Sequence, residues 1–237
     1  MSNDAFIFDI ETAPLPDDQL DQFAPSRDPF DFAAVKTGNL KDQAKIVAKV
    51  ASAEKAHEAA EDAKQDEWRK RCTLDAKTSR VLAIGMWQGD EYCIAVDSER
   101  NGIDCERQTL LTFWQKLSKA LEKGRRVYGW NILGFDFPFV IQRSVINQVR
   151  IPVNIDIPLW RNHWIRDLQD IWTGGKGYCK LDLCARAMGI EGKQDLSGKL
   201  PHEIFAEDRE AFLDYLKQDV MICKEIQERV ASVWLNQ

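Results

Sequence analysis

Short apolar segments alternate along the sequence with longer amphipathic segments, and this order is typical of a mixed α/β protein. The segments expected to form strands are residues 5–10, 80–87, 91–96, 126–130 and 165–171. The segments with helical spacing of their apolar residues are 106–123, 135–149, 181–188 and 206–234. No linker divides the sequence, so we predict one domain over residues 1–237, with a mixed five-stranded sheet flanked by helices.

One stretch departs from this alternation. Residues 40–71 are rich in Ala, Lys and Glu and are expected to form one long helix or two. The second half, residues 53–71, is polar on nearly every side, so it projects into solvent or contacts a partner. We therefore predict a helical insertion over residues 33–71, between the first and second strands. A lid, a docking surface for a protein partner and a plain insertion all fit this composition.

The composition excludes several classes of protein. No run of about 18 apolar residues occurs, so we expect no transmembrane helix and no membrane partner. The first residues lack the basic start and the cleavage site of a signal peptide, which makes a cytoplasmic protein the expectation. The six cysteines are spread singly, without the C-x-x-C spacing of a zinc ribbon or a redox motif.

Charge is distributed unevenly along the chain. The whole sequence has a formal net charge of −6, but residues 123–186 contain ten Lys and Arg against five Asp and Glu. A basic segment in an acidic protein can contact phosphates locally without strong non-specific binding to duplexes. The alternative is a set of solvated basic side chains.

Four carboxylates and a tyrosine occupy positions that suggest chemistry. Asp9 and Glu11 are two residues apart at the end of the first strand, so both side chains lie on one face of that strand. Asp136 opens a helix that follows a strand and a loop. Asp219 lies on the last helix, where Tyr215 precedes it by one turn on the same face. Taken singly, these residues also fit an exposed strand-end acid, a helix N-cap and an ordinary helix face.

Taken together, the four carboxylates indicate a metal site. Close carboxylates repel one another unless cations neutralise them, and ligand sets made of oxygen alone favour Mg²⁺ or Mn²⁺. The set therefore predicts two divalent metal ions, about 3.5–4 Å apart, in a site for phosphoryl transfer.

The same residues fall into three ordered motifs, which are D-x-E-T at 9–12, N-x-x-x-F-D at 131–136 and Y-x-x-x-D at 215–219. In this order the motifs resemble those of the DEDD 3′–5′ exonucleases, which have a ribonuclease H-like fold. The tyrosine of the third motif resembles the DEDDy branch of this DnaQ-like group. Further resemblance, to stand-alone predicted exonucleases related to the proofreading domain of family-B DNA polymerases, lies in DIETAPLP (9–16), CTLDAKTSRVLAIG (72–85) and GIEGKQDLSGK (189–199).

The resemblance implies a role for each motif residue. Asp9 would bridge both metal ions, and Glu11 and Asp219 would complete the first site. Asp136 would hold the second ion through water, and Tyr215 would orient the water that attacks the terminal phosphodiester. The products would be nucleoside 5′-monophosphates, released stepwise from the 3′ end.

The resemblance also suggests substrate contacts. Thr12, Asn131 and Phe135 correspond to residues that touch a frayed 3′ end, and Leu15 corresponds to an apolar wedge between the last two bases. The Phe135 ring can stack on a base, and packing in the core is the alternative.

Phosphate contacts are expected from basic residues of the second half of the chain. Lys180, Lys193 and the loop at 173–177 (TGGKG) are the candidates. The loop lacks the spacing of a phosphate-binding loop, and an ordinary turn is the alternative.

The resulting hypothesis is a metal-dependent 3′–5′ exonuclease that acts on single-stranded DNA or frayed 3′ ends. Because no polymerase domain follows Asp219 in the sequence, we expect trimming, DNA repair, or proofreading in trans. An exoribonuclease is the nearest alternative, since the motifs do not show how a 2′-hydroxyl would be treated. A nucleic-acid-binding or scaffolding module without catalysis is the alternative from another class.

Overall fold

The chain forms two compact units in a computed structural model that describes residues 5–38, 40–96, 105–192 and 199–233. The first unit comprises Met1–Ala13 and Arg80–Gln237, and the second comprises Pro14–Ser79. Lys193, Trp234 and part of the segment 189–199 lie outside the described residues. None of the helices in the described part of the chain combines the length and the hydrophobicity that a membrane-spanning segment needs.

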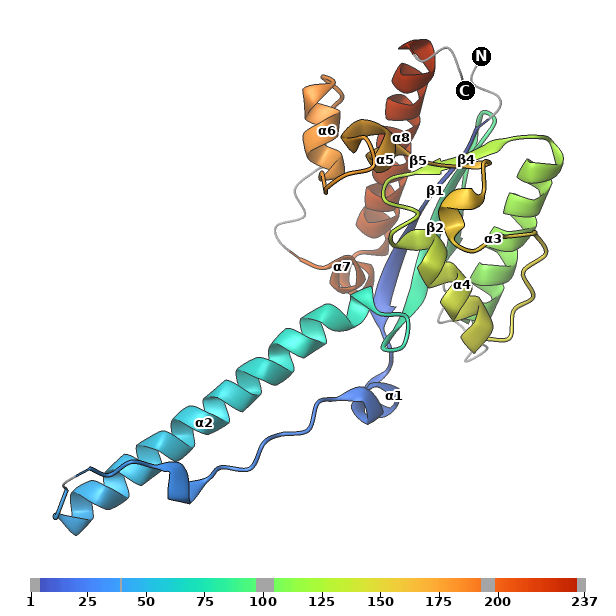
Figure 1. The fold of residues 1–237 in the computed structure, drawn as a ribbon. Helices are drawn as coiled ribbons and strands as arrows, with labels where there is room; N and C mark the ends of the chain where they lie inside the picture. The colour runs from blue at the N-terminus through green and yellow to red at the C-terminus, as the bar shows by residue number, and fades with distance from the viewer. Residues whose placement is uncertain (1–4, 39, 97–104, 193–198, 234–237) are drawn as a thin grey trace. The chain divides into compact units, whose positions relative to one another are not determined.

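The described residues of the first unit include a five-stranded sheet with the order β3-β2-β1-β4-β5 (Figure 1). The strands are β1 (Ala5–Pro14), β2 (Ser79–Gln88), β3 (Glu91–Val96), β4 (Arg126–Gly129) and β5 (Ile165–Asp167). β1, β4 and β5 are parallel, whereas β2 and β3 form an antiparallel hairpin. The hairpin turn contains Gly89, whose φ of 68° is one that glycine adopts without strain. The mixed sheet and the hairpin confirm the predictions from the sequence.

Two faces of β1 bury different parts of the core. On one face the Phe8 ring lies 5.0 Å from the rings of Phe113 and Phe137, measured between centroids. On the other face Ile7 belongs to the same buried cluster as Val220. The helices in the described residues of this unit are α3 (Cys105–Glu122), α4 (Asp136–Ile146), η5 (Leu159–Arg161), α5 (Leu168–Thr173), α6 (Leu181–Ala187), α7 (Pro201–Glu207) and α8 (Arg209–Val233). Figure 1 shows α3 and α4 on one side of the sheet and α8 on the other, in agreement with these contacts.

A buried ion pair joins α3 to α4. The Glu106 carboxylate accepts hydrogen bonds from Arg143 Nε at 2.8 Å and Nη2 at 2.6 Å. The same carboxylate accepts from the Val81 amide of β2 at 2.8 Å and from Asn147 Nδ2 at 2.9 Å. Glu106 and Arg143 are 6% and 5% exposed, so this polar cluster lies inside the core and fixes two helices and a strand together.

Two predicted elements differ from what their apolar spacing indicates, since one is shorter and the other is divided. The fifth strand ends at Asp167, whose carboxylate accepts a hydrogen bond from the Gln169 amide at 2.9 Å and begins α5. The last predicted helix is divided at Asp208, whose carboxylate accepts from the Ala211 amide at 3.0 Å at the start of α8. In both places an aspartate side chain satisfies an amide that the first turn of a helix leaves unpaired, and this interrupts the apolar pattern.

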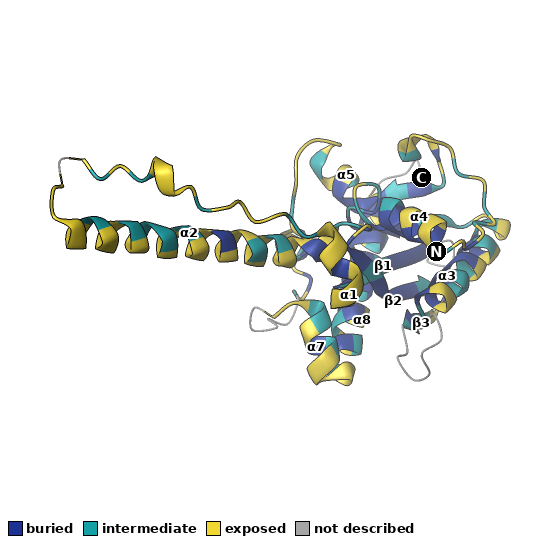
Figure 2. Cartoon of the chain, turned by 90° about the horizontal axis from the view of Figure 1, so that it is seen from below, coloured by how far each residue is buried: buried dark blue, intermediate teal, exposed yellow. Residues whose placement is uncertain are grey.

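The second unit is built around one long helix, α2 (Gln43–Arg71), whose start is capped by the Asp42 carboxylate. The rest of the unit contains α1 (Asp17–Leu20), η1 (Asp21–Phe23), η2 (Phe32–Ala34) and η3 (Cys72–Leu74). The segment before α2 is tied to that helix by polar contacts, from the Asp28 amide to Glu61 and from Gln65 Nε2 to the Pro25 carbonyl. Among the described residues of α2, Glu61 is the one that is buried. Figure 2 shows most of this helix in the colours of exposed and intermediate residues.

Candidate active site

Asp9 and Glu11 lie on the face of β1 that also carries Ile7. Alternate side chains of a strand point to the same face, and Ile7 packs in the cluster that contains Val220 of α8. Both acids are half-buried. The strand continues beyond them to Pro14, so the prediction that they stand at its end is wrong. The longer strand keeps both carboxylates on a regular backbone and on the face toward α8.

Asp219 completes a group of three carboxylates. One carboxylate oxygen each from Asp9, Glu11 and Asp219 lies within 4.8 Å of the others. Within the described part of the chain, these three side chains form the group that could hold a metal ion. Asp219 is 3% exposed. Tyr215 is half-buried one turn earlier on α8. Three negative groups this close fit one or more hard divalent cations, because the ligand atoms are all oxygen and the charges otherwise repel.

Asp136 lies beside the same strand but is not a member of that group of three. It is the first residue of α4, and its carboxylate accepts a hydrogen bond from the Ile10 amide at 3.1 Å. Ile10 stands between the two acids of β1. Burial, together with the charge of Asp167, raises the pKa of Asp136 to about 7, and hydrogen bonds from backbone amides act against this rise.

The loop before Asp136 is held by Asp167, a residue that the sequence analysis did not identify. The Asp167 carboxylate accepts from the Asn131 amide and from the Leu133 amide, each at 2.9 Å. Burial raises the pKa of Asp167, which is 5% exposed. An aspartate between an apolar strand and Leu168 is a helix-start signal, and this signal alone was available in the sequence.

Asn131 has an unusual backbone within this loop. Its φ is 58°, a left-handed conformation that asparagine tolerates better than most residues. Its Oδ1 accepts from Gln169 Nε2 at 3.2 Å. A Cβ on Gly134 would lie 2.4 Å from that Oδ1, so position 134 requires glycine for the Asn131 side chain to keep its place. The loop that leads to Asp136 is therefore fixed from two sides.

The predicted substrate contacts lie in different surroundings. Thr12 is buried in β1, and Phe135 is half-buried with its ring 5.4 Å from that of Phe139. Lys180 is exposed at the start of α6. Leu15 belongs to the second unit, where its amide donates to the Thr78 carbonyl at 3.0 Å. Lys193 lies outside the described residues.

Tyr92 of β3 is a further group that senses the charge of the site. Its pKa is raised by burial and by the negative charges of Asp9 and Asp214. A Cβ on Gly85 would lie 3.1 Å from its hydroxyl oxygen. The sequence offered no signal for this residue, because a tyrosine in a strand is ordinary.

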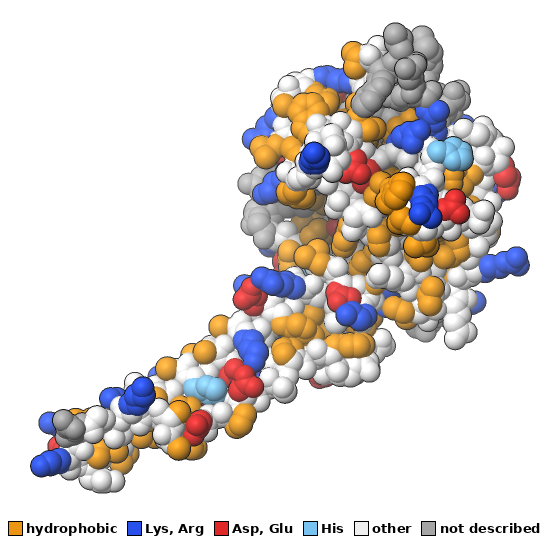
Figure 3. All heavy atoms as spheres, in the orientation of Figure 1, with side chains coloured by type: hydrophobic (Ala, Val, Ile, Leu, Met, Phe, Trp, Pro, Cys, Tyr) orange, Lys and Arg blue, Asp and Glu red, His pale blue; other side chains and the backbone are white. Residues whose placement is uncertain are grey.

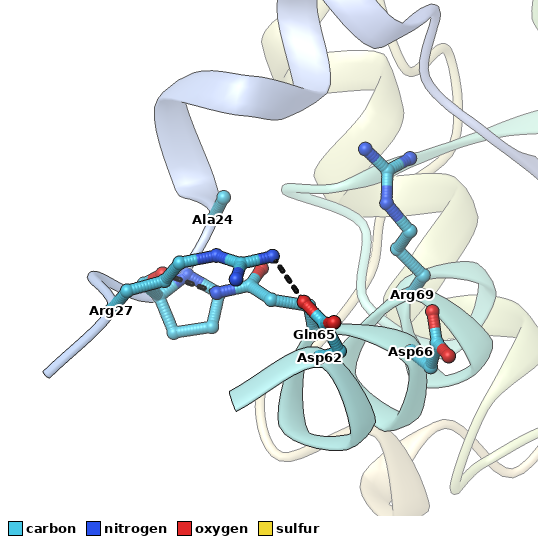
Figure 4. A pocket seen from close by; sticks show the side chains of 7 residues that line it. Ala24, Arg27, Asp62, Gln65, Asp66 and Arg69 are labelled. Carbon is cyan, nitrogen blue, oxygen red and sulfur yellow. Dashed lines mark hydrogen bonds and ion pairs between the residues drawn. The ribbon is translucent and has the colours of Figure 1, made fainter. Parts of the chain in front are cut away.

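A separate hollow lies within the second unit, between α2 and the segment before it (Figure 4). Its two basic side chains are paired, since Arg27 contacts Asp62 at 2.7 Å and Arg69 contacts Asp17 at 3.0 Å. The three-carboxylate group of the described residues does not include any of its lining residues. Its chemistry is that of a polar surface rather than of a catalytic site.

Comparisons with known proteins agree with the geometry of the first unit. Residues 73–223 match the family described as predicted 3′–5′ exonucleases related to the exonuclease domain of PolB. This range includes Asp136, Tyr215 and Asp219 and begins after Asp9 and Glu11. A search of curated proteins gave no match.

A solved structure shares the fold. One similar structure is that of the family B DNA polymerase from the hyperthermophilic archaeon Pyrobaculum calidifontis. The TM-score is 0.55 and the sequence identity is 13%. The match covers 95% of this chain and 24% of the polymerase chain. The shared fold agrees with the expected ribonuclease H-like architecture. Since the family match covers more than half of the sequence, the chain belongs to the family of predicted 3′–5′ exonucleases related to the exonuclease domain of PolB.

Proposed function

We propose that this exonuclease removes nucleoside 5′-monophosphates from single-stranded or frayed 3′ ends of DNA by a two-metal mechanism. The observation that carries the proposal is the group of three carboxylates on β1 and α8, whose ligand oxygens lie within 4.8 Å of one another. Mg²⁺ and Mn²⁺ are the ions that such an oxygen ligand set favours.

The carboxylates are assigned to two ion sites. Asp9, Glu11 and Asp219 would hold the first ion, and Asp9 would also contribute to the second. Asp136 would serve the second ion, in keeping with its place beside β1 and outside the group of three. When bound, the two ions supply an activated water and neutralise the charge that develops on the phosphate and on the departing 3′-oxygen.

The remaining motif residues position the reactants. Tyr215 lies one turn from Asp219 on α8, so its hydroxyl orients the attacking water without having to ionise. Thr12, Asn131 and Phe135 are assigned to the terminal nucleotide, and Lys180 to a phosphate next to it. The Asn131 loop suits this task because hydrogen bonds to Asp167 and Gln169 fix it before a substrate arrives.

The test is a cleavage assay on 5′-labelled single-stranded DNA and on RNA of the same sequence, with Mg²⁺, Mn²⁺ or EDTA. The wild type should shorten DNA from its 3′ end only with metal, and Asp9→Ala should abolish the ladder. Asp214→Ala is the matched control, because Asp214 is an exposed acid on α8 next to Tyr215. Faster shortening of RNA would identify an exoribonuclease, and binding without any cleavage would identify a module without catalysis.

A further inference from the structure

Two large aromatic side chains are exposed on either side of a glycine-rich loop in the first unit. Trp172, near the end of α5, is 45% exposed, and Tyr178 is 74% exposed. Their neighbours Ile171 and Cys179 instead pack against the buried cluster under α8. The backbone here is therefore anchored to the core, while both aromatic rings are left at the surface.

Hydrogen bonds of Gln169 link the Asn131 loop to the two backbone segments that carry the aromatic residues. Gln169 Nε2 donates to Asn131 Oδ1 at 3.2 Å, and Gln169 Oε1 accepts from the Cys179 amide at 3.3 Å. Tyr178 directly precedes Cys179, and Trp172 lies one helical turn after Gln169 on the same face of α5. Gln169 thus connects the two exposed aromatics to the loop that leads to Asp136.

A second hydrogen bond fixes the far end of the glycine-rich loop between Trp172 and Tyr178. Trp130 Nε1, at the end of β4, donates to the Cys179 carbonyl at 2.9 Å. Between the anchors, Gly174, Gly175 and Gly177 all have positive φ and open space beside them. The glycine-rich loop is held at both ends, so the fold sets the distance between the backbone positions of Trp172 and Tyr178.

The charge around these aromatics fits an anionic strand. Lys176 lies between Trp172 and Tyr178 in the sequence, and Lys180 follows Tyr178 by two residues. Both lysines are exposed. Figure 3 shows hydrophobic and basic side chains intermixed over the part of the first unit that contains α5 and α6. Aromatic faces interleaved with cations suit the bases and phosphates of an unpaired nucleic acid, whereas an apolar protein partner would leave the lysines unpaired.

We propose that Trp172 and Tyr178 stack on bases of the unpaired strand, and that Lys176 and Lys180 contact its phosphates, upstream of the nucleotide held by the Asn131 loop. The proposal rests on the proposed function, and it adds a binding site several nucleotides long. It makes single-stranded nucleic acid a far better substrate than a single nucleotide ester. Each base stacked on an aromatic ring contributes binding that hardly depends on sequence.

The test separates binding of the strand from chemistry at its end. Binding is followed by fluorescence anisotropy of a 5′-fluorescein oligothymidylate of about 12 nucleotides in EDTA, a length within the usual range of about 4–16 for such sites. Chemistry is followed with the p-nitrophenyl ester of thymidine 5′-monophosphate and Mn²⁺, a substrate too short to reach the aromatics.

Four variants suffice. Trp172→Ala and Tyr178→Ala should each weaken binding of the oligonucleotide by about 5- to 100-fold and leave hydrolysis of the ester unchanged. Tyr178→Phe should bind like the wild type, because it keeps the ring face. Trp160→Ala is the matched control, since Trp160 is 69% exposed but belongs to η5 and not to the segments that Gln169 links to the Asn131 loop.

Two results would overturn the proposal. One is oligonucleotide binding by both alanine variants that equals binding by Trp160→Ala. The other is a loss of ester hydrolysis in step with the loss of binding, which would mean that the substitutions disturb the Asn131 loop. Failure of the proposed function looks different, because the wild type would then leave the ester intact with every metal while still binding the oligonucleotide.

Discussion

The first unit buries charged side chains, whereas the second unit keeps nearly all of its charges at the surface. In the first unit the buried charged residues include Glu106, Asp136, Arg143, Asp167 and Asp219. Among the described residues of the second unit, Glu61 is the buried charged residue. Ion pairs of this unit join exposed partners such as Arg27 and Asp62. Because burial of a charge is costly unless a partner compensates it, the first unit is where charges have specific tasks.

The difference indicates what holds each unit together. The first unit surrounds its buried charges with a core of large apolar side chains, for example Phe8, Phe113 and Trp114. Apart from the bond to Glu61, the ion pairs that hold α2 in the second unit join exposed groups, which contribute little individually and weaken with salt. Substitutions of charged residues should therefore have large effects in the first unit and small effects in the second.

The largest effect is expected at the three-carboxylate group. Asp219→Asn should lower turnover by about 10²–10³-fold or more, because it removes a group that holds a cation at the reacting phosphate. The melting temperature without metal should not fall, since the substitution relieves repulsion from Asp9 and Glu11. Mn²⁺ should raise the melting temperature of the wild type and not of the variant.

Asp214→Asn is the matched control, because it removes an exposed acid from the same helix. It should retain both turnover and stabilisation by Mn²⁺. A collapse of the melting temperature in Asp219→Asn would instead give Asp219 a structural role. Burial of a charge in the first unit would then not indicate a functional residue.

The next largest effect is expected at the buried pair between α3 and α4. Arg143→Met should lower the free energy of unfolding by about 3–5 kcal/mol, because it leaves the Glu106 carboxylate buried without its cation. Urea unfolding followed by circular dichroism measures this change. The double variant Glu106→Leu/Arg143→Met should recover part of the loss, and a loss below about 1 kcal/mol in the single variant would mean that water compensates the charge.

The periodic part of the fold could be predicted from the sequence. Two short apolar segments on either side of residues 88–90 predicted β2, β3 and their turn. Helical spacing predicted α3 and α8, because side chains on one face of a helix must reach a common core. The mixed sheet was predicted from the order of the expected strands and helices, and the family from the ordered motifs. The proximity of Asp9 and Glu11 to Asp219 followed from the same motifs, although the roles of these residues stay predictions.

The rest depends on contacts between distant parts of the chain. Asp167 bonds to Asn131 and Leu133 across more than thirty residues, and a lone aspartate carries no local sign of such a partner. The same holds for Gln169, which links Asn131 to Cys179. The end of β5 and the break at Asp208 were missed because a capping side chain overrides apolar spacing over one or two residues.

A moderate effect is expected where a buried carboxylate orders backbone amides. Asp167→Asn should cost about 1–3 kcal/mol of unfolding free energy, because one amide oxygen cannot satisfy the three amides that Asp167 serves. It should also slow hydrolysis of the nucleotide ester by displacing the Asn131 loop. Asp170→Asn, which removes an exposed acid on α5 whose charge repels that of Asp167, is the matched control and should lower neither quantity.

The pH dependence of this penalty has a definite sign. Burial raises the pKa of Asp167 in the folded chain above its ordinary value, so the unfolded chain releases the proton first as the pH rises. The stability contributed by Asp167 is therefore complete in acid and declines toward neutral pH. The penalty of Asp167→Asn should be larger at about pH 4 than at about pH 7, and the opposite trend would contradict the burial of a costly charge.

The smallest effect is expected in the second unit, and it is the sharpest test of the comparison. Arg27→Met applies the change made at Arg143 to a pair whose partners are 58% and 62% exposed. An exposed pair contributes less than about 1 kcal/mol, so hydrogen exchange of the α2 amides should accelerate by less than about fivefold. Added salt should bring the wild type close to the variant, because it screens the Arg27–Asp62 attraction. If exchange instead accelerated by orders of magnitude, the pair would be as important to α2 as Glu106 and Arg143 are to the core, and exposure would not decide what a charge contributes in this protein.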